Sequence, residues 1–169
     1  MREMRLHKRE IHDPSLIKDI LDECDVVRLG LHDEEGMFIV PVNYGYELKD
    51  NNGNVKITLY FHGSGEGRKA DAIKADPHAA IEMDCRHEII TGDYTCSYSY
   101  AYRSIMGSGT IVRLEAEKEK RYALGKLMEH LAPEAEIEFS KKMLERTDAY
   151  RIDVDYFTGK ERKRKQQRS

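Results

Sequence analysis

The stretch that decides the fold is VKITLYFHGSGEGRK, residues 55–69. Its first part alternates between apolar and polar side chains, and one face carries Val55, Ile57, Leu59 and Phe61. This period of two predicts a half-buried β-strand over 55–61. Three glycines then interrupt the pattern, and the basic pair Arg68-Lys69 follows them. The glycines predict a loop, and Ala70, Ala72 and Ile73 predict a short helix that ends before Pro77.

The residues before this stretch predict a helix and two further strands. Asp13 can cap a helix that begins at Pro14 and runs to Cys24. Apolar β-branched residues then indicate strands over 26–31 and 37–46, separated by a turn over 33–36. Because a second turn over 50–53 leads into the strand at 55–61, we expect an antiparallel meander.

The residues after it add strands and two more helices. Strands are expected over 79–84, over 95–115 as one or two strands, and over 150–156. Gly107 and Gly109 indicate a bulge or bend in the second of these. Helices are expected over 117–131 and 134–144. The sum is a mainly β fold with peripheral helices, in which six or seven antiparallel strands close into a small barrel because closure removes exposed edges.

Length and composition exclude several classes of protein. A chain of 169 residues is expected to form one domain, here 1–159, followed by a basic tail over 160–169. The net charge of −3 argues against a general nucleic-acid binder, and three cysteines without a C-x-x-C pair argue against a disulfide framework. No apolar run is long enough for a signal peptide or a membrane span, so we expect a cytoplasmic protein.

The loop at 63–67 is the strongest candidate for chemistry. Glycines allow backbone N–H groups to approach an anion, a helix start adds partial positive charge, and Arg68-Lys69 adds formal charge. These features suit a phosphate, although the Walker A spacing is absent. A flexible turn with solvated basic residues is the competing interpretation. His62 could act on a proton beside the loop, or it could simply close the strand.

Other kinds of site are not supported by spacing. The intervals between His78, Cys85, His87 and Cys96 match no common zinc pattern, so no metal site is expected. Ser64 lies in a G-S-G sequence and not in the G-x-S-x-G elbow of a serine hydrolase.

The order of several short motifs resembles the pyridoxamine 5′-phosphate oxidase-related superfamily, and within it the nitroimidazole-resistance (Nim) type. These motifs are Arg28-Leu29, VPVNYGY at 40–46, YFHG at 60–63, GRK at 67–69 and SIMGSG at 104–109. The opening Arg9-Glu10-Ile11 with Asp13 and the closing Thr158-Gly159-Lys160 also suit the Nim type, so the likeness covers about 9–160. The resemblance implies an FMN-binding split β-barrel that forms a homodimer with FMN at the subunit interface.

The resemblance also assigns roles to residues of this chain. Arg68 and Lys69 match the pair that grips the flavin phosphate, and His62 matches a catalytic histidine near the flavin. Val42 and Asn43 match the strand beside the flavin ring, and Ser104 matches a polar contact from a later strand. The full set of expected cofactor-binding residues is Val42, Asn43, Tyr60, His62, Gly63, Gly67, Arg68, Lys69, Ser104 and Gly107.

The chain departs from the family's pyridoxamine-phosphate oxidases at its C-terminal end. Their substrate motif contains Arg, Leu and His, whereas this chain has only Gly159-Lys160 and the basic tail. We therefore expect a different small-molecule substrate, and the variable tyrosine-rich stretch over 85–102 is the expected place of substrate choice.

Three functions follow as hypotheses. The first is an FMN-dependent oxidoreductase that reduces a small organic compound, of which a nitroaromatic is one example. The second is a non-catalytic flavin- or haem-binding protein. The third is a barrel scaffold that binds a protein or RNA partner through the basic tail, which strongly salt-dependent binding would reveal. The substrate, the electron donor and the choice of FMN over a deazaflavin stay open.

Overall fold

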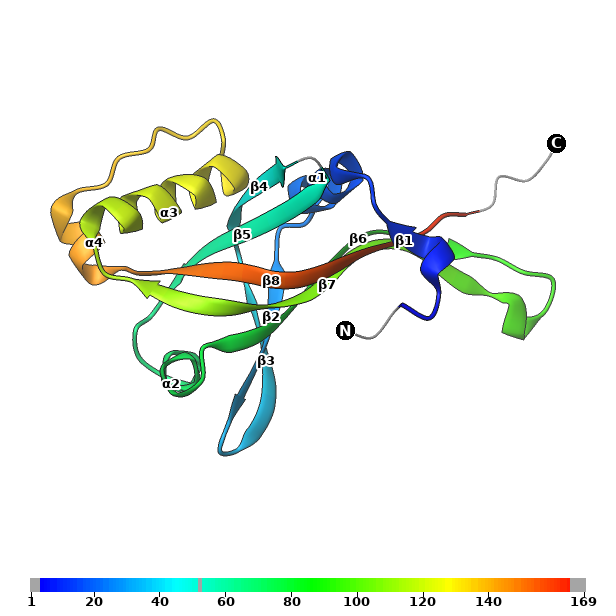
Figure 1. Cartoon of the computed structure of the whole chain (residues 1–169), viewed down its shortest axis with the longest axis horizontal. Helices are drawn as coiled ribbons and strands as arrows, with labels where there is room; N and C mark the ends of the chain where they lie inside the picture. The colour runs from blue at the N-terminus through cyan, green and yellow to red at the C-terminus, as the bar shows by residue number, and fades with distance from the viewer. Residues whose placement is uncertain (1–3, 52, 165–169) are drawn as a thin grey trace.

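A computed structural model of the chain describes residues 4–51 and 53–164 and contains one antiparallel sheet with helices around it (Figure 1). The strands are β1 (Glu10–Ile11), β2 (Val27–Asp33), β3 (Gly36–Val42), β4 (Gly45–Asn51), β5 (Asn54–Gly63), β6 (His78–Ile90), β7 (Ser99–Leu114) and β8 (Asp148–Arg162). The α-helices are α1 (Pro14–Glu23), α2 (Arg68–Ala75), α3 (Glu117–Leu131) and α4 (Lys141–Arg146), and two short 3-10 helices are η1 (His7–Arg9) and η2 (Thr95–Ser97).

The sheet curls into a split barrel because its two edge strands are neighbours in the chain. The strand order is β3-β2-β6-β7-β8-β5-β4, and β1 adds to β8. Only Asn43 and Tyr44 separate β3 from β4, so the two ends of this path must come close together. No ladder joins β3 to β4 among the described residues, and the barrel is therefore open between them.

Alternation along the strands builds the core. The face of β5 that carries Ile57, Leu59 and Phe61 points into the barrel, as the sequence pattern predicts. Tyr44 is fully buried where β3 passes into β4, and its hydroxyl donates a hydrogen bond to the Leu21 carbonyl at 2.8 Å. This bond satisfies the one polar atom that the ring carries into the core.

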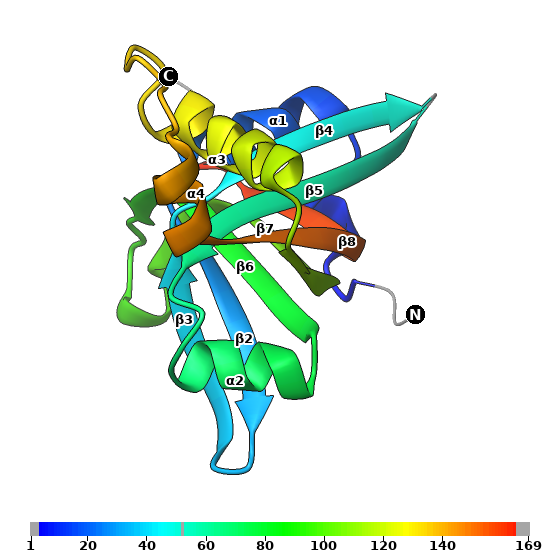
Figure 2. The same ribbon diagram turned by 90° about the vertical axis from the view of Figure 1, so that its left-hand side faces the viewer.

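Helix α1 packs against the barrel core, whereas helix α3 packs against a second apolar cluster on the outer face of β5. Helix α1 begins as predicted: Pro14 is its first residue, and the Asp13 side chain accepts a hydrogen bond from the Ser15 N–H at 2.9 Å. Helix α3 spans 117–131, also as predicted, and packs across β4, β5 and β8. Figure 2 shows α3 lying over β4 and β5, whereas α2 lies at the opposite end of the sheet.

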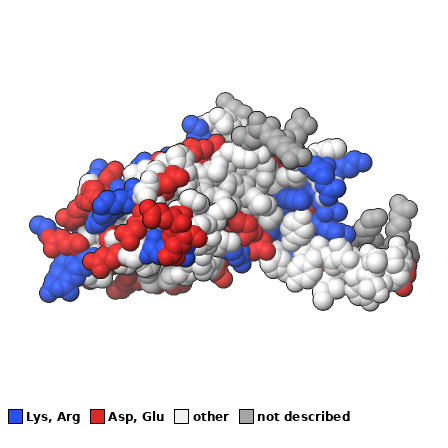
Figure 3. Space-filling view, turned by 90° about the horizontal axis from the view of Figure 1, so that it is seen from below, with Lys and Arg blue, Asp and Glu red and all other residues white. Residues whose placement is uncertain are grey.

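An arm made of the ends of β6 and β7 extends away from the barrel (Figure 1). It starts at a bulge between Cys85 and Glu88, where Arg86 adopts a positive φ of 55°. Its exposed apolar and aromatic side chains are Ile89, Tyr94, Tyr98 and Tyr100. Figure 3 shows this arm as a largely uncharged projection beside a group of Lys and Arg side chains.

The structure corrects five expectations. The strand expected over 37–46 is two strands, β3 and β4, with the buried Tyr44 between them. The expected meander is therefore wrong: β2–β3 and β4–β5 are two separate hairpins at opposite edges of the sheet. The helix expected over 134–144 is wrong for most of its length: only Lys141–Arg146 is helical, capped by Ser140. The strands expected over 79–84 and 150–156 are longer, since β6 continues into the arm. Strand β8 reaches Arg162 by pairing with β7 and β1.

The irregularity expected in the long strand is confirmed, whereas part of the expected tail belongs to the sheet. The bulge predicted at Gly107 and Gly109 lies between Ser108 and Gly109 in the β7–β8 ladder. The expected basic tail begins inside β8, and residues 165–169 lie outside the described part of the chain. Within that described part, no helix has the length and apolar character needed to span a bilayer.

Candidate functional site

The candidate site is the loop between β5 and α2 together with the first residues of α2. Strand β5 ends at Gly63, and α2 begins at Arg68. Gly67 is the N-cap residue with a φ of 93°, a conformation that favours glycine, and no side chain caps the helix. The first N–H groups of α2 are therefore not satisfied by a capping side chain, and they add partial positive charge at this point.

Lys69 is the cation that this loop holds in place. A Cβ on Gly63 would collide with the Lys69 side chain, so the glycine allows the lysine to lie directly against the backbone of β5. The Lys69 ammonium lies 5.5 Å from the centre of the Phe61 ring, and the side chain is half-buried. Burial lowers the pKa of Lys69. Among the described residues it makes no ion pair, which leaves its charge available to a ligand.

Arg68 has different surroundings, although it is the next residue. Its guanidinium makes two hydrogen bonds to the Asp33 carboxylate, at 2.6 and 2.9 Å, and lies 4.2 Å from the centre of the Phe38 ring. Glu35 lies 3.6 Å away as a further acid. The hydrogen bonds with Arg68 lower the pKa of Asp33, and the same contacts raise the pKa of Arg68. The positive charge of Arg68 is thus already neutralised by the acidic side chains of the β2–β3 hairpin.

The acids around this loop have no signal in the sequence that links them to it. Residues 33–36 predict only a turn, and the partner of Asp33 becomes visible only where the fold places it against α2. The same holds for Asp148, which accepts hydrogen bonds from Arg113 at 2.5 and 2.8 Å. A Cβ on Gly65 would collide with the Asp148 carboxylate, so this ion pair supports the loop.

His62 lies at the end of β5 and is exposed. It pairs in register with Ala149 of β8. Side chains alternate along a strand, so His62 points to the face of β5 opposite Phe61, and Lys69 contacts Phe61. The histidine and the lysine are neighbours along the backbone, yet their side chains leave β5 on different faces.

Asn43 and Val42 lie where β3 passes into β4. Gly45 of β4 pairs with Tyr60 of β5, and the two strands are antiparallel. Asn43, two residues before Gly45, therefore lies toward the same end of β5 as His62, two residues after Tyr60. The Asn43 side-chain amide donates a hydrogen bond to the Asp25 carbonyl at 3.4 Å, and Val42 packs against the barrel core. The fold thus brings Asn43 toward the end of β5 from a distant place in the sequence.

The other predicted cofactor residues lie elsewhere. Ser104 is nearly buried on β7 between Asp84 and Lys160, and Gly107 lies between Ile81 and Phe157. Tyr60 is buried beneath α3. None of these three residues makes a described contact with the loop at 63–67.

Gly107 belongs to a second feature, a shallow cavity on the outer face of the sheet. The cavity measures about 490 Å³ and is lined by residues of β2, β3, β6, β7 and β8. Two large apolar side chains on this face, Ile39 and Met106, are 69% and 56% exposed. Exposed apolar side chains grouped in this way are typical of a surface that another molecule covers.

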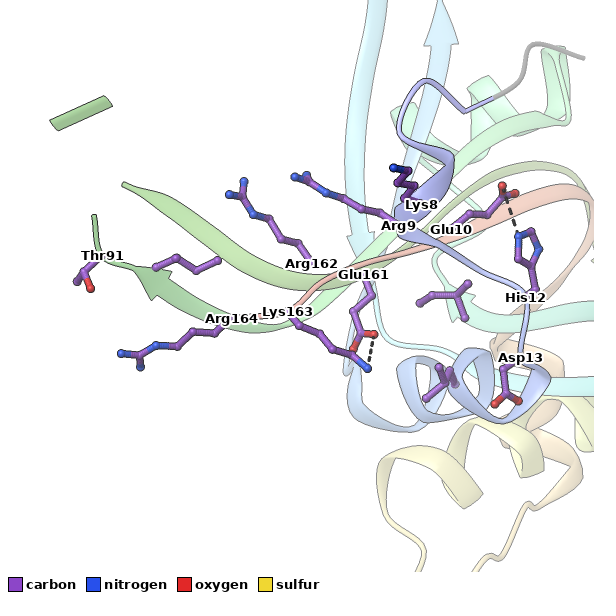
Figure 4. Close-up of a pocket in the computed structure, with 13 residues that line it drawn as sticks. Lys8, Arg9, Glu10, His12, Asp13, Thr91, Glu161, Arg162, Lys163 and Arg164 are labelled. Carbon is purple, nitrogen blue, oxygen red and sulfur yellow. Dashed lines mark ion pairs between the residues drawn. The ribbon is translucent and has the colours of Figure 1, made fainter. Parts of the chain in front are cut away.

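A second cavity lies away from the loop, at the N-terminal side of the barrel. It measures about 690 Å³ and is formed by residues 8–13, Leu16, the end of β6 and residues 161–164. Figure 4 shows Arg9, Arg162 and Arg164 extending outward from this cavity, while Glu161 and Lys163 form an ion pair at 3.1 Å. It contains none of the predicted site residues.

Comparisons with known proteins identify the family and the architecture of the chain. Residues 13–161 match the family model described as pyridoxamine 5′-phosphate oxidase. A search of curated proteins found no match.

Solved structures share the architecture. A proposed 5-nitroimidazole antibiotic resistance protein from Bacteroides thetaiotaomicron is 30% identical, with a TM-score of 0.75, and the match covers 89% of this chain and 85% of that one. The flavocytochrome Anf3 from Azotobacter vinelandii is 19% identical, with a TM-score of 0.77 over 96% of this chain and 73% of that one. The FAD and heme binding protein from Mycobacterium smegmatis is 21% identical, with a TM-score of 0.76 over 90% and 73%. The last two likenesses concern the fold alone.

Proposed function

The chain belongs to the pyridoxamine 5′-phosphate oxidase family, and from this premise we propose that it binds FMN through the loop at 63–67 and acts as an FMN-dependent oxidoreductase. The substrate class that we propose is a small organic compound, with nitroaromatics as the first to test. This proposal takes support from the similar protein of Bacteroides thetaiotaomicron, which carries the name of 5-nitroimidazole antibiotic resistance.

The observation that carries the proposal is the position of Lys69. A half-buried lysine without an acidic partner among the described residues lies against Gly63, next to the uncapped start of α2. Burying a cation is unfavourable unless a compensating charge arrives. A phosphate group supplies that charge and accepts hydrogen bonds from the free N–H groups of α2. The residues present therefore fit the phosphate end of FMN.

The flavin would supply the redox chemistry, and the protein would hold and orient it. Lys69 and the backbone of 67–69 would bind the phosphate. Asn43 and Val42, which the resemblance assigns to the ring, lie where β3 passes into β4. His62 is proposed to hold or donate a proton on the exposed side of β5, where its imidazole can reach a bound substrate.

We further propose a homodimer in which a second copy covers the outer face that carries Ile39, Met106 and Gly107. In one subunit this face is open and its cavity is shallow. Cofactor sites usually enclose most of the ligand surface, so a flavin that reaches this face requires a second wall.

The experiment that tests FMN binding compares Lys69→Ala with Lys74→Ala, a change of an exposed lysine in the last turn of the same helix. Titration is followed by the quenching of flavin fluorescence. Lys69→Ala should weaken FMN by about 10-fold or more, the scale of one charge-assisted contact, and Lys74→Ala should have little effect. Riboflavin, which lacks the phosphate, should bind both variants equally.

Equal losses of affinity for FMN and riboflavin in Lys69→Ala would contradict a role of Lys69 in binding the phosphate.

The absorbance spectrum of the purified protein distinguishes bound flavin from haem. Reoxidation of the reduced flavoprotein by a nitroaromatic acceptor then tests the oxidoreductase. His62→Ala should lower that rate by about 100-fold while FMN affinity changes little. An unchanged rate would remove His62 from the reaction.

A further inference from the structure

A cavity of about 780 Å³ lies between α3 and the sheet, on the face of β5 that points away from the barrel core. Tyr60 of β5, Leu114 of β7 and Arg151 of β8 form its sheet side, and α3 forms the opposite wall. Its size is within the range of sites for small organic ligands. None of the residues assigned to the FMN phosphate lines it.

A glycine on α3 opens this cavity. Gly125 lies in the middle of the helix and faces the cavity, and a Cβ at this position would have no atom within 4 Å. A glycine is unfavourable inside a helix, and here no close packing requires it. A larger side chain at 125 would fill space that is open in the structure.

Two tyrosine rings form a rigid wall of the cavity. The rings of Tyr60 and Tyr122 are nearly perpendicular, at 82°, with centres 5.8 Å apart. Both hydroxyls donate hydrogen bonds to the Glu47 carboxylate, at 2.6 and 2.8 Å. Because Glu47 holds both hydroxyls, the rings are fixed and offer their apolar surfaces to the cavity.

Two cations that line the cavity can face an anion. The lining contains four basic and two acidic residues, but Arg121 pairs with Glu117 and Lys126 with Glu129, which leaves Lys118, without a described ion pair, and Arg151. The cations are Lys118, Arg121, Lys126 and Arg151, and the acids are Glu119 and Glu129. Arg151 binds Asp153 through Nε and Nη2, at 3.2 and 2.9 Å, while its Nη1 makes no described hydrogen bond. Both bonds of Arg151 reach one carboxylate oxygen, Oδ2, whereas Arg68 engages both oxygens of Asp33, so Arg151 is held less firmly and its Nη1 faces a ligand more readily.

We propose that this cavity binds a flat aromatic acid, with its ring against Tyr60 and Tyr122 and its carboxylate or sulfonate facing Arg151. The aromatic wall recognises the ring, and the basic lining recognises the acid group. The site is separate from the proposed FMN site, and it stands whether or not FMN binds.

Calorimetric titration of the full chain with naphthalene sulfonate tests the proposal. The probe should bind, and the uncharged analogue naphthalene methanol should bind more weakly by about 5-fold or more. Gly125→Leu should weaken the probe by about 10-fold or more, because the leucine fills the cavity. Gly125→Ala is the matched control: it removes the same helix glycine but adds only one methyl group, and it should change affinity by less than about 2-fold.

Two further variants and one competitor complete the design. Tyr122→Ala removes one aromatic wall of the cavity, and because Tyr122 is exposed the change leaves the core intact. This variant should also bind the probe more weakly. Arg151→Gln should abolish the preference for the sulfonate over the alcohol. Saturating FMN should leave the probe affinity unchanged.

Each opposite result would overturn the proposal: no binding up to about 1 mM, full affinity in both Gly125→Leu and Tyr122→Ala, or displacement of the probe by FMN. If FMN does not bind, only the proposed function is contradicted. The aromatic-acid site is tested separately, by the probe titrations that contain no flavin.

Discussion

Lys69 and Arg68 are neighbours in the sequence, but the acids around them differ. Arg68 is held by Asp33 and lies close to Glu35, whereas Lys69 makes no ion pair among the described residues. An arginine that already binds a carboxylate must exchange that partner for a phosphate, and the exchange offsets much of the gain. At the scale of single residues, we therefore expect Lys69 to make the larger contribution to the proposed binding of the FMN phosphate.

Asp33→Asn should strengthen FMN binding by about 2- to 5-fold, because it releases the guanidinium of Arg68 toward the loop. Fluorescence titration measures the change. Glu34→Gln is the control, since Glu34 is exposed in the same turn and makes no described ion pair. Weaker FMN binding in Asp33→Asn would mean that the ion pair positions Arg68 for the phosphate instead of competing with it.

The affinity for FMN should fall as the pH rises through the lowered pKa of Lys69. Burial lowers this pKa from its usual 10.5, so the ammonium loses its proton while exposed lysines are still charged. FMN titrations between about pH 7 and about pH 10 measure the effect. Lys69→Arg stays charged over this range and should remove the decrease. A decrease of the same size in the arginine variant would assign it to another group.

At the scale of elements, α3 is positioned by a glycine on the strand that it crosses. A Cβ on Gly45 of β4 would collide with the backbone of Lys126 and Leu127, so the helix can approach β4 only where the side chain is absent. Glu47 on the same strand accepts hydrogen bonds from Tyr60 of β5 and Tyr122 of α3. The Tyr60 bond lowers the pKa of Glu47, which therefore stays ionised at neutral pH.

Gly45→Ala should lower the free energy of unfolding by about 1–3 kcal/mol, because α3 must move away from the sheet. The same change in α3 itself, Gly125→Ala, should raise the free energy of unfolding by about 0.5–1 kcal/mol, since it adds a better helix former in open space. Urea denaturation measures both variants. If Gly45→Ala were as stable as the parent protein, the close contact between α3 and β4 would be disproved.

At the scale of the whole molecule, one face of the sheet and the arm stay uncovered. Ile39 and Met106 are exposed on that face, and the arm exposes Ile89 and several tyrosines. Figure 3 shows that the arm carries few charged side chains. A second copy would remove both apolar surfaces from water, which is the driving force that we assign to the proposed dimer.

Light scattering at micromolar concentration should give a mass of twice 19.6 kDa. Met106→Glu should shift the protein toward the monomer, because it places a charge in the centre of the proposed interface. Met143→Glu is the matched control, since Met143 is 54% exposed on α4, away from this face. A parent protein that is monomeric with FMN bound would contradict the dimer, and so would equal effects of the two substitutions on the mass.

The local elements can be predicted from the sequence alone. Alternation over 55–61 predicted β5, Asp13-Pro14 predicted the start of α1, and the apolar spacing over 117–131 predicted α3. These features depend on neighbours within a few residues, which is why their patterns are visible in the sequence. The order of short motifs also identified the family, and the family model confirms it.

Which charged side chains pair with one another depends on the tertiary fold. Asp33 and Arg68 are 35 residues apart, and the pairing that occupies Arg68 follows from the way the β2–β3 hairpin packs on α2. The same is true of Tyr60: its sequence motif suggested the cofactor, but α3 returns from much later in the chain to cover it. Side-chain partners across such distances depend on how the sheet curls, and local periodicity carries no information about that curvature.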